Sequence, residues 1–380
     1  MSKQTRSGTD LLRGIITVFR NIEDERSARS LHPLVNVLVM ALCGVLSGCE
    51  SLEDIEVFSE ERKEFFGRFL DVTGGIPSES TFQRCLAMVR PSVMERALGS
   101  WLCSNLPVLQ GQVLAADGKS LTGSAWEKEG LAPLHILHLW ATEQRVLIAQ
   151  KAVEGAPGEP SGLADLLQLL VLKGAVITGD ANFCTTGNAA AVIAAEADYL
   201  FTLKGNRAAL HSFVSETFAE ADEAEKGMIE KTSHRTENVG HGRKEVRVVE
   251  AMEWDEWPLP DEAWPGLRTM VRVYRERTDA KGTSYDTSYA LTSLPPDAAF
   301  IAHCLRQHWS VENQLHWILD ICFHEDNSQI TTRTLAENLA ILRRVALSIL
   351  QRNGGKKSIK AKRFRASLNQ DYLLALLASS

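Results

Sequence analysis

Two aspartates of the 380-residue sequence occupy positions at which acid chemistry could be arranged. Asp117 directly follows an apolar run at residues 113–116, and Asp180 follows a second run at residues 175–178 and one glycine. Both runs predict short buried strands, and ligands in α/β folds gather at strand ends. On neighbouring strands the two carboxylates would repel each other unless a cation lay between them, and Mg²⁺ prefers oxygen ligands. An aspartate in such a position is also typical of a turn or a helix cap.

A third group of polar side chains recurs along the segment HCLRQHWSVENQLHWILD, residues 303–320. His308, Glu312 and His316 are spaced i, i+4 and i+8, so a helix places them on one face, and Asp320 extends the stripe. This spacing fits a zinc site, although the adjacent His-Glu pair of zinc peptidases is absent. A polar face turned to solvent is the alternative interpretation.

The two aspartates and Glu312 together indicate a two-metal site for phosphoryl transfer. In such a site one Mg²⁺ activates water or a 3′-hydroxyl, and the other stabilises the leaving oxygen. The carboxylates act mainly as ligands, so no nucleophilic side chain is required. A zinc hydrolase that uses His308 and His316 is the other enzymatic interpretation.

The elements that must position these residues alternate between strand and helix. We expect three strands, then a helix, a strand, a helix and a strand, at residues 113–116, 134–140, 146–152, 162–172, 175–178, 189–196 and 199–203. Three consecutive strands can form an antiparallel meander, and strands that follow helices can join it in parallel. This order is that of the ribonuclease H-like fold, an α/β class with a mixed sheet and flanking helices.

The pattern also predicts two domains. Residues 1–104 are expected to form a small all-α domain, with helices at 34–49 and 52–70 and a further helix start near Ser78. Residues 105–380 are expected to form the catalytic domain. A mostly β insertion interrupts this domain at about 205–297, with strands expected at 244–250, 268–275 and 288–294.

The composition excludes several classes of protein. The chain is 44% apolar and 23% charged, which is typical of a globular protein and not of a disordered one. The longest apolar run, residues 34–49, is shorter than the roughly 20 residues that span a bilayer. No signal-peptide pattern begins the chain, and seven cysteines without a CxxC pair favour reduced thiols. We therefore expect a cytoplasmic protein that does not enter a membrane.

The charge is distributed unevenly along the chain. The net charge is −7, yet residues 343–365 contain nine basic residues and no acid. These are Arg343, Arg344, Arg352, Lys356, Lys357, Lys360, Lys362, Arg363 and Arg365. Such a segment on an acidic chain predicts a basic surface for a polyanion, and the alternative is a solvated helix face.

Several motifs agree with those of a known family in sequence as well as in residue class. They are ADGKSLTGS around Asp117, VITGDANFCTT around Asp180, DYLFTLKGNR at 198–207, HGRKEVR at 241–247, HWSVENQLHWILDICFHED at 308–326, NLAILRR at 338–344 and SIKAKRFRASLNQDYLLALL at 358–377. In these motifs the chain resembles the bacterial insertion-sequence DDE transposases, in the branch of the H-repeat-associated proteins. The resemblance covers about residues 20–377, and the N-terminal stretch resembles the helical domain that accompanies this catalytic domain.

The resemblance implies that Asp117, Asp180 and Glu312 are the catalytic triad. It further implies that they bind two Mg²⁺ ions, for which Mn²⁺ can substitute. Related cut-and-paste transposases carry Tyr, Arg and Lys around the glutamate, where this sequence has Leu305, His308 and Leu319. Two segments also depart from the family pattern. They are GAPGEPSG and DANFCT, the second of which begins at Asp180, and neither departure removes an expected ligand.

The implied function is that of an insertion-sequence transposase. Such an enzyme is a metal-dependent endonuclease that hydrolyses a phosphodiester at the element end and joins the freed 3′-hydroxyl to target DNA. Its expected partners are double-stranded DNA and a second copy of itself in a synaptic complex, at the nucleoid. Expected DNA contacts are Lys119, Lys204, Asn206, Arg243, His308, Asn313, Arg343, Arg344, Lys356, Lys357, Lys360, Lys362, Arg363 and Arg365. The alternatives are a nuclease of the same fold without strand transfer, and a domesticated DNA-binding protein without catalysis.

Overall fold

The computed structural model describes residues 8–26, 30–103, 109–125, 130–168, 170–224, 230–240, 242–254, 259–260 and 263–378. The chain forms two compact units. Unit 1 comprises residues 1–107, 118–155 and 312–380, and unit 2 comprises residues 108–117 and 156–311. The expected domain boundary at residues 104 and 105 lies outside the described residues, so the division into two domains stays a prediction.

Unit 1 is mostly helical. Its helices are α1 (Gly8–Arg20), α2 (Leu34–Ser47), α3 (Leu52–Glu61), α4 (Lys63–Phe66), α5 (Glu79–Met88), α6 (Pro91–Cys103), α11 (Trp317–Phe323), α12 (Arg333–Arg352), α13 (Ile359–Leu368) and α14 (Gln370–Ala378). Helix α2 confirms the expected buried helix and ends where Gly48 adopts a left-handed backbone with a φ of 108°. The helix expected at 52–70 is instead divided, because Arg62 leaves the helical conformation between α3 and α4.

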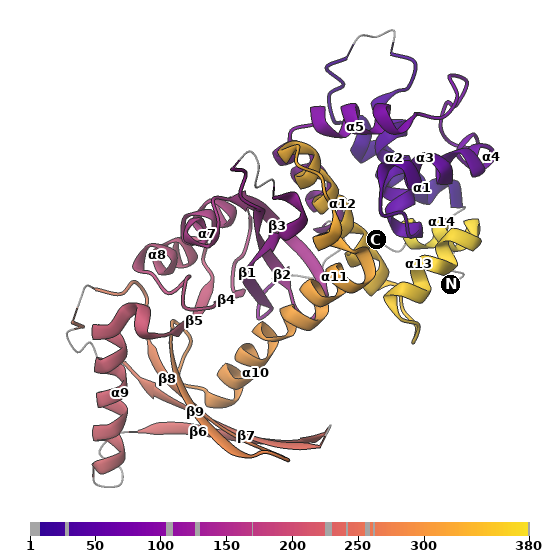
Figure 1. Ribbon diagram of the computed structural model, residues 1–380. Helices are drawn as coiled ribbons and strands as arrows, with labels where there is room; N and C mark the ends of the chain where they lie inside the picture. Colours follow the sequence, from indigo (N-terminus) through magenta and orange to yellow (C-terminus); the bar gives the residue numbers. More distant parts are fainter. Residues whose placement is uncertain are drawn as a thin grey trace, which may run out of the picture. The chain divides into compact units, whose positions relative to one another are not determined.

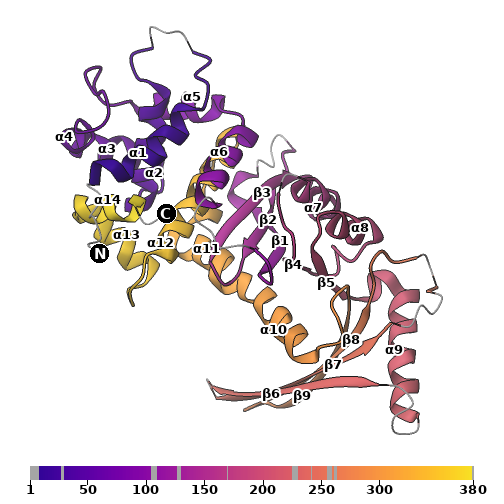
Figure 2. The ribbon, with the colours of Figure 1, turned by 180° about the vertical axis from the view of Figure 1, so that it is seen from behind.

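Helix α12 is the buried centre of unit 1. It packs against α2, α5 and α6, and against strand β3 (Val146–Val153). Helix α13, near the C-terminus, packs against α2 from the N-terminal region, and the two lie side by side in Figures 1 and 2. Segments from both ends of the chain therefore share one hydrophobic core.

Strand β1 (Val113–Leu121) is longer than the sequence predicts. Its last residue, Leu121, packs with Leu134 and Ile136 of β2 (Leu134–Ala141) and with side chains of α12. Burial of Leu121 keeps the chain extended through the Asp-Gly pair that the sequence presents as a turn signal. Strands β2 and β3 form an antiparallel hairpin, as expected.

The first half of β1 belongs to unit 2, where two further strands lie parallel to each other and to it. Strand β4 (Val176–Gly179) pairs with β1, and β5 (Asp198–Leu203) pairs with β4. Helices α7 (Glu159–Leu167) and α8 (Thr186–Ala194) precede β4 and β5, because a parallel pair needs a crossover. The sheet order is β3-β2-β1-β4-β5-β9-β8-β7-β6, so the chain is a mixed α/β protein with a nine-stranded sheet.

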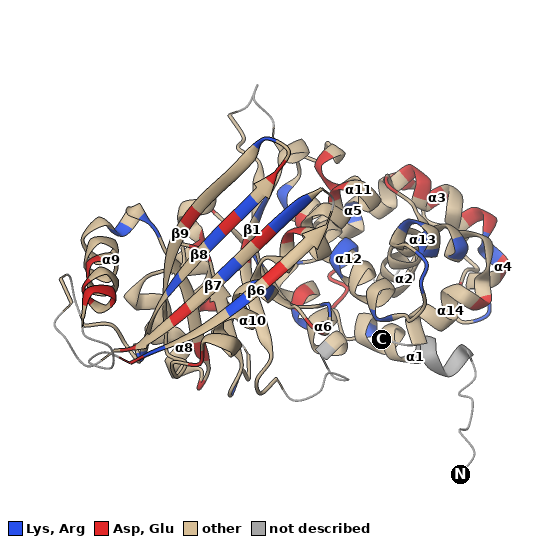
Figure 3. Ribbon diagram, turned by 90° about the horizontal axis from the view of Figure 1, so that it is seen from below, with Lys and Arg blue, Asp and Glu red and all other residues tan. Residues whose placement is uncertain are grey.

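The expected β insertion is present as four long antiparallel strands that follow helix α9 (Ala208–Glu223). They are β6 (Lys231–Gly240), β7 (Arg243–Glu253), β8 (Thr269–Asp279) and β9 (Gly282–Thr292), and β9 pairs with β5. Three of the strands were expected. Strand β6 was missed because most of its side chains are exposed and it has no apolar alternation. Figure 3 shows basic and acidic residues alternating along β7 and β8.

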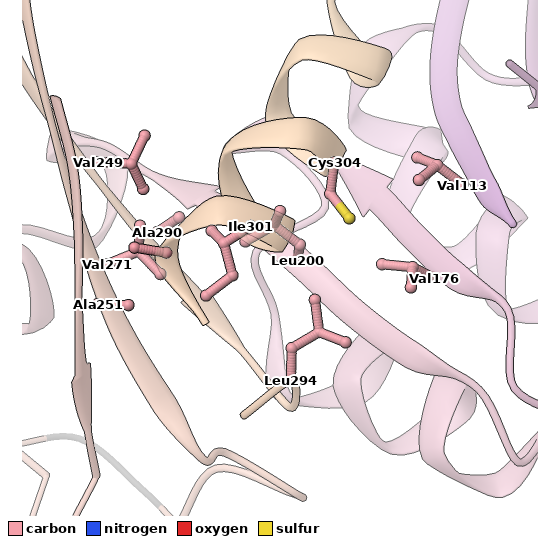
Figure 4. Close-up of a cluster of buried hydrophobic side chains, with 11 residues drawn as sticks. Val113, Val176, Leu200, Val249, Ala251, Val271, Ala290, Leu294, Ile301 and Cys304 are labelled. Atoms are coloured by element: carbon pink, nitrogen blue, oxygen red, sulfur yellow. The ribbon is translucent and has the colours of Figure 1, made fainter. Parts of the chain in front are cut away.

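Helix α10 (Ala298–His308) covers one face of the unit 2 sheet. Its Ile301 and Cys304 pack into a buried cluster with side chains from β1, β4, β5, β7, β8 and β9 (Figure 4). The cluster comprises Val113, Val176, Leu200, Val249, Ala251, Val271, Ala290, Leu294, Ala298, Ile301 and Cys304. This packing fixes the helix against the strands that precede the two candidate aspartates.

No single helix among the described ranges is long and apolar enough to cross a membrane. One pair of helices, Leu34–Ser47 with Leu52–Glu61, passes the same test only when the two are taken together across a bend of 98°.

Candidate active site

Asp117 and Asp180 occupy matching positions on two parallel strands. Strands β1 and β4 pair in the register Val113–Val176 to Ala115–Thr178, and Asp117 and Asp180 each follow the last paired residue of their strand by two residues. Side chains alternate along a strand, so Asp117 shares a sheet face with Val113, which packs in the cluster with α10. The two aspartates therefore belong to one small region of the sheet face that α10 covers.

The two carboxylates differ in their local structure. Asp117 lies inside β1, whereas Asp180 follows the last residue of β4. The Oδ1 atom of Asp180 accepts a hydrogen bond of 2.9 Å from the backbone N–H of Asn182. A Cβ atom at Gly179 would lie 2.7 Å from the Phe183 side chain, so this turn requires a glycine. Asp180 thus stabilises a turn with one oxygen.

Helix α10 leads from the sheet to Glu312. Asp297 caps the helix by accepting hydrogen bonds from the backbone N–H groups of Ala299 and Phe300. At the other end, the Nδ1 atom of His308 lies 3.1 Å from the hydroxyl of Thr178, two residues before Asp180 along β4. Glu312 follows His308 by four residues along the chain.

The helix continues through a π-helical turn, η5 (Glu312–His316), into α11. Such turns are often found at functional sites because the extra residue re-aims the side chains. The single polar face expected for His308, Glu312 and His316 is accordingly interrupted. His308 and His316 are buried, whereas 63% of the Glu312 side chain is exposed.

Two side chains of unit 1 could hold a metal ion together. His316 Nδ1 is 3.8 Å from Glu312 Oε2. A carboxylate and an imidazole are donors that divalent metals accept. Asp117 and Asp180, the other two expected ligands, belong to unit 2.

Lys119, an expected DNA contact, is bound by acids of its own unit. It is 9% exposed, and its ammonium group lies 2.8 Å from Asp320 and 3.1 Å from Asp326. Burial lowers the pKa of Lys119, but hydrogen bonds to these two carboxylates outweigh it and raise that pKa overall. Burial in turn raises the pKa of Asp320. The ion pair with Asp320 connects β1 to α11, the helix that follows the π turn at Glu312.

Four residues of the basic segment are buried and do not offer their charges to solvent. Arg343 and Arg344 lie in α12, and Lys362 and Arg363 lie in α13. The guanidinium of Arg363 donates to the backbone oxygens of Val45 and Cys49, and burial lowers its pKa to about 10. The sequence predicts DNA contacts for these four residues, and that assignment stays a prediction. In the structure their side chains are buried within unit 1.

The other expected DNA contacts are mostly on the surface. Lys356, Lys357, Lys360, Arg365, Lys204, Asn206, Arg243 and Asn313 are exposed. Asn206 also donates a hydrogen bond of 2.9 Å to the backbone oxygen of Ala181, beside the Asp180 turn. His308 is the exception, since it is buried against Thr178.

Sequence reasoning missed a group of buried polar residues near His316. They are His138 of β2, Glu325 and Arg344, which are all fully buried. The β2 sequence LHILHLWA is buried on both faces, so its histidines carry no periodic signal. The motif HWSVENQLHWILDICFHED contains Glu325 and the motif NLAILRR contains Arg344, but the spacing of neither indicates which charged residue is buried.

Comparison with protein families finds two matches along the chain. A model described as "Transposase DDE domain" matches residues 109–349. A second model, described as "DDE_Tnp_1-associated", matches residues 16–102. Together the two models cover both the helical N-terminal segment and the segment that contains the candidate site.

Curated relatives cover almost the whole chain. "Putative transposase YncI" of Escherichia coli O157:H7 is 30% identical over 96% of this chain and 93% of its own length. "H repeat-associated putative transposase YhhI" of Escherichia coli strain K12 is 29% identical over 92% of this chain and 93% of its own. A solved "piggyBac transposase synaptic complex with hairpin DNA" aligns with 96% of this chain and 78% of that chain, at 12% identity and a TM-score of 0.40, a likeness too low to add to these matches.

Proposed function

The chain belongs to the family of DDE transposases, and we propose that it is the transposase of an insertion sequence. The reaction would begin with hydrolysis of a phosphodiester at the end of the element. The freed 3′-hydroxyl would then attack target DNA. The match of the transposase DDE domain to residues 109–349, which contain Asp117, Asp180 and Glu312, is the observation that carries this proposal.

Each acidic residue would have a defined part in this reaction. Asp117, Asp180 and Glu312 would hold the divalent cations, with Asp117 and Asp180 on neighbouring strands and His316 beside Glu312. Bound Mg²⁺ or Mn²⁺ would supply Lewis acidity for the attacking and leaving oxygens. The ribonuclease H-like arrangement of the catalytic domain is part of the same proposal. It is supported by the parallel pairing of β1, β4 and β5, with an antiparallel hairpin after β1.

Double-stranded DNA would be bound through its backbone by exposed basic residues. Lys356, Lys357, Lys360 and Arg365 are the exposed part of the basic segment. Lysine and arginine at such positions neutralise phosphates without reading sequence. A homodimer would bring together the two ends of the element, in the cytoplasm at the nucleoid.

The test is strand cleavage on a supercoiled plasmid that carries the gene with its flanking DNA. We expect nicks at defined ends of the element with Mg²⁺ or Mn²⁺. We expect none with Ca²⁺, because Ca²⁺ takes looser coordination of higher number. Joined products should appear when target DNA is added, and flanking inverted repeats with a target duplication should coincide with the cut ends.

Each alternative predicts a different result in this assay. Cleavage without any joined product would indicate a nuclease of the same family. Specific binding without cleavage in any metal would indicate a domesticated DNA-binding protein. Cleavage that requires Zn²⁺ would indicate that the histidines dominate the site.

A further inference from the structure

Unit 1 contains an ion pair with no exposed surface. Arg344 of α12 donates from Nη1 to Glu325 Oε1 at 2.7 Å and from Nη2 to Oε2 at 3.1 Å, and both side chains are 0% exposed. A buried pair of this kind offers little net stability over apolar side chains, but it fixes geometry strongly. The guanidinium of Arg344 therefore has one orientation.

Of the other donors of this guanidinium, Nη1 also donates to the backbone oxygen of Ala340, and Nε is aimed at His138. Arg344 Nε donates to His138 Nε2 at 2.6 Å. Arginine can only donate, so Nε2 must be the unprotonated nitrogen and the ring proton must lie on Nδ1. That Nδ1 is buried and has no hydrogen-bond partner among the described residues. A buried donor without an acceptor is uncommon and needs a reason in the structure.

The other side of His138 faces the candidate active site. Its ring lies 5.5 Å, centroid to centroid, from the ring of His316, at an interplanar angle of 57°. His316 is also buried, and its Nδ1 is 3.8 Å from Glu312 Oε2. Buried contacts therefore run without interruption from Glu325 through Arg344 and His138 to His316.

We propose that His138 is a positioning residue of the active site, held by Arg344 and Glu325 so that it fixes the ring of His316 beside Glu312. The proposal rests on the proposed function, because it concerns the same metal-binding set. Residues behind a metal ligand orient the ligand, and their loss typically costs about 10- to 100-fold in metal affinity or activity. Arg344 thus acts within the protein core, where the charge pattern had suggested DNA.

The variant His138→Gln tests this arrangement. A glutamine carbonyl can still accept from Arg344, but it removes the ring that contacts His316. The matched control is His135→Gln, since His135 is a buried histidine three residues earlier on β2, is bonded to Ser120 Oγ at 2.8 Å and lies on the opposite face. Both variants should unfold at similar temperatures.

Two readouts are needed. The first is the nitrogen NMR spectrum of His316 in the metal-free protein, which reports its tautomer and ring environment. The second is Mn²⁺ affinity, measured by electron paramagnetic resonance without DNA. We expect His138→Gln to shift the His316 signals and to weaken Mn²⁺ binding about tenfold or more, and His135→Gln to do neither.

Asp117→Asn separates the two proposals. If Asp117→Asn leaves Mn²⁺ binding unchanged, the proposed metal site is wrong, and the His316 spectrum of His138→Gln alone decides the positioning role. If Asp117→Asn abolishes binding while His138→Gln changes neither readout, only the positioning role is wrong. Equal effects of His135→Gln and His138→Gln would also overturn it, because the loss would then follow from damage to β2.

A double variant covers the case in which His138→Gln does not fold. Arg344→Met with Glu325→Gln removes both buried charges together, so neither is left uncompensated. It should fold, release His138, and reproduce the shifted His316 signals and the weaker Mn²⁺ binding. A folded double variant with wild-type spectra and wild-type affinity would contradict the proposal.

Discussion

Asp117 and Asp180 each lie two residues beyond the last paired residues of the parallel strands β1 and β4, Ala115 and Thr178. The two aspartates are far apart in the chain, and β2, β3 and α7 lie between their strands. Their matching position is therefore a property of the sheet. It also explains why neither aspartate can be assigned a role from its own neighbours.

We expect Asp180→Asn to abolish strand cleavage and to leave DNA binding intact. Asparagine keeps the size of the side chain and an oxygen for the Asn182 N–H, but it loses the charge that a cation requires. The loss should exceed the roughly 100-fold typical of residues behind a metal ligand. Cleavage rates and gel-shift affinities on the same DNA would measure both properties.

The matched control for this variant is Asp198→Asn. Asp198 begins the neighbouring strand β5 and accepts a hydrogen bond of 2.8 Å from Ser293 Oγ, which asparagine can also accept. The Asp198→Asn variant should cleave DNA at the wild-type rate. Equal losses in the two variants would show that a disturbed sheet, and not a lost ligand, explains the result.

The exposed basic residues near the C-terminus should dominate the salt dependence of DNA binding. We expect Lys356, Lys357, Lys360 and Arg365, all changed to Gln, to weaken binding to specific and random duplexes alike. The slope of log affinity against log salt should become shallower by about 0.9 for each phosphate contact removed. Affinity measured at several salt concentrations gives this slope.

A charge-preserving variant controls for the chemistry of the side chain. Lys356→Arg with Lys357→Arg and Lys360→Arg keeps the positive charges and should keep the slope. An unchanged slope in the Gln variant would identify this segment as an ordinary solvated surface.

Lys119 should contribute to stability and not to the salt dependence of DNA binding. Lys119→Met leaves Asp320 and Asp326 without their shared cation, so we expect the free energy of unfolding to fall by about 1–3 kcal/mol. Lys119→Arg should retain most of the free energy of unfolding that Lys119→Met loses. Denaturant unfolding measures the loss, and a cycle with Asp320→Asn measures the coupling of the pair. If Lys119→Met instead made the salt dependence of DNA binding shallower and left stability unchanged, Lys119 would be a DNA contact.

Glu95 of α6 should make the stability depend on pH. Burial raises the pKa of Glu95 from 4.5 to about 8, although its carboxyl accepts a hydrogen bond of 3.0 Å from the Gln150 backbone N–H. The folded state therefore holds a proton that the unfolded chain has released above pH 4.5. The stability from this group is complete below that pH and is lost as the pH rises through about 8.

Glu95→Gln should remove this dependence, because glutamine keeps the acceptor and cannot ionise. We expect it to melt above the wild type at about pH 9, by some 2–4 °C for each kcal/mol regained, and to differ less at about pH 4.5. Glu64→Gln, at an exposed position of α4, controls for the loss of a charge. A melting difference that does not vary with pH would contradict the assignment.

Much of the architecture could be predicted from local patterns. The buried helix α2, the hairpin of β2 and β3, and the strands β4 and β5 follow from apolar runs between turn residues. The strand at β1 was predicted too short because the apolar run ends at residue 116, whereas burial of Leu121 against β2 and α12 extends the strand. Strand β6 was missed because an exposed strand at the edge of a sheet has no apolar period to detect.

The sequence by itself determined the kinds of residue that could form the site, since carboxylates after apolar strands and a polar helical stripe are local patterns. The tertiary structure alone decided which of them meet. It paired the strands that lead to Asp117 and Asp180, interrupted the helical stripe with a π turn at Glu312, and placed His138 against His316. It also buried Arg344 with Glu325 and left Lys356 exposed, although the two belong to one basic run. Charge along a chain does not specify burial, because burial depends on which distant segments pack against each helix face.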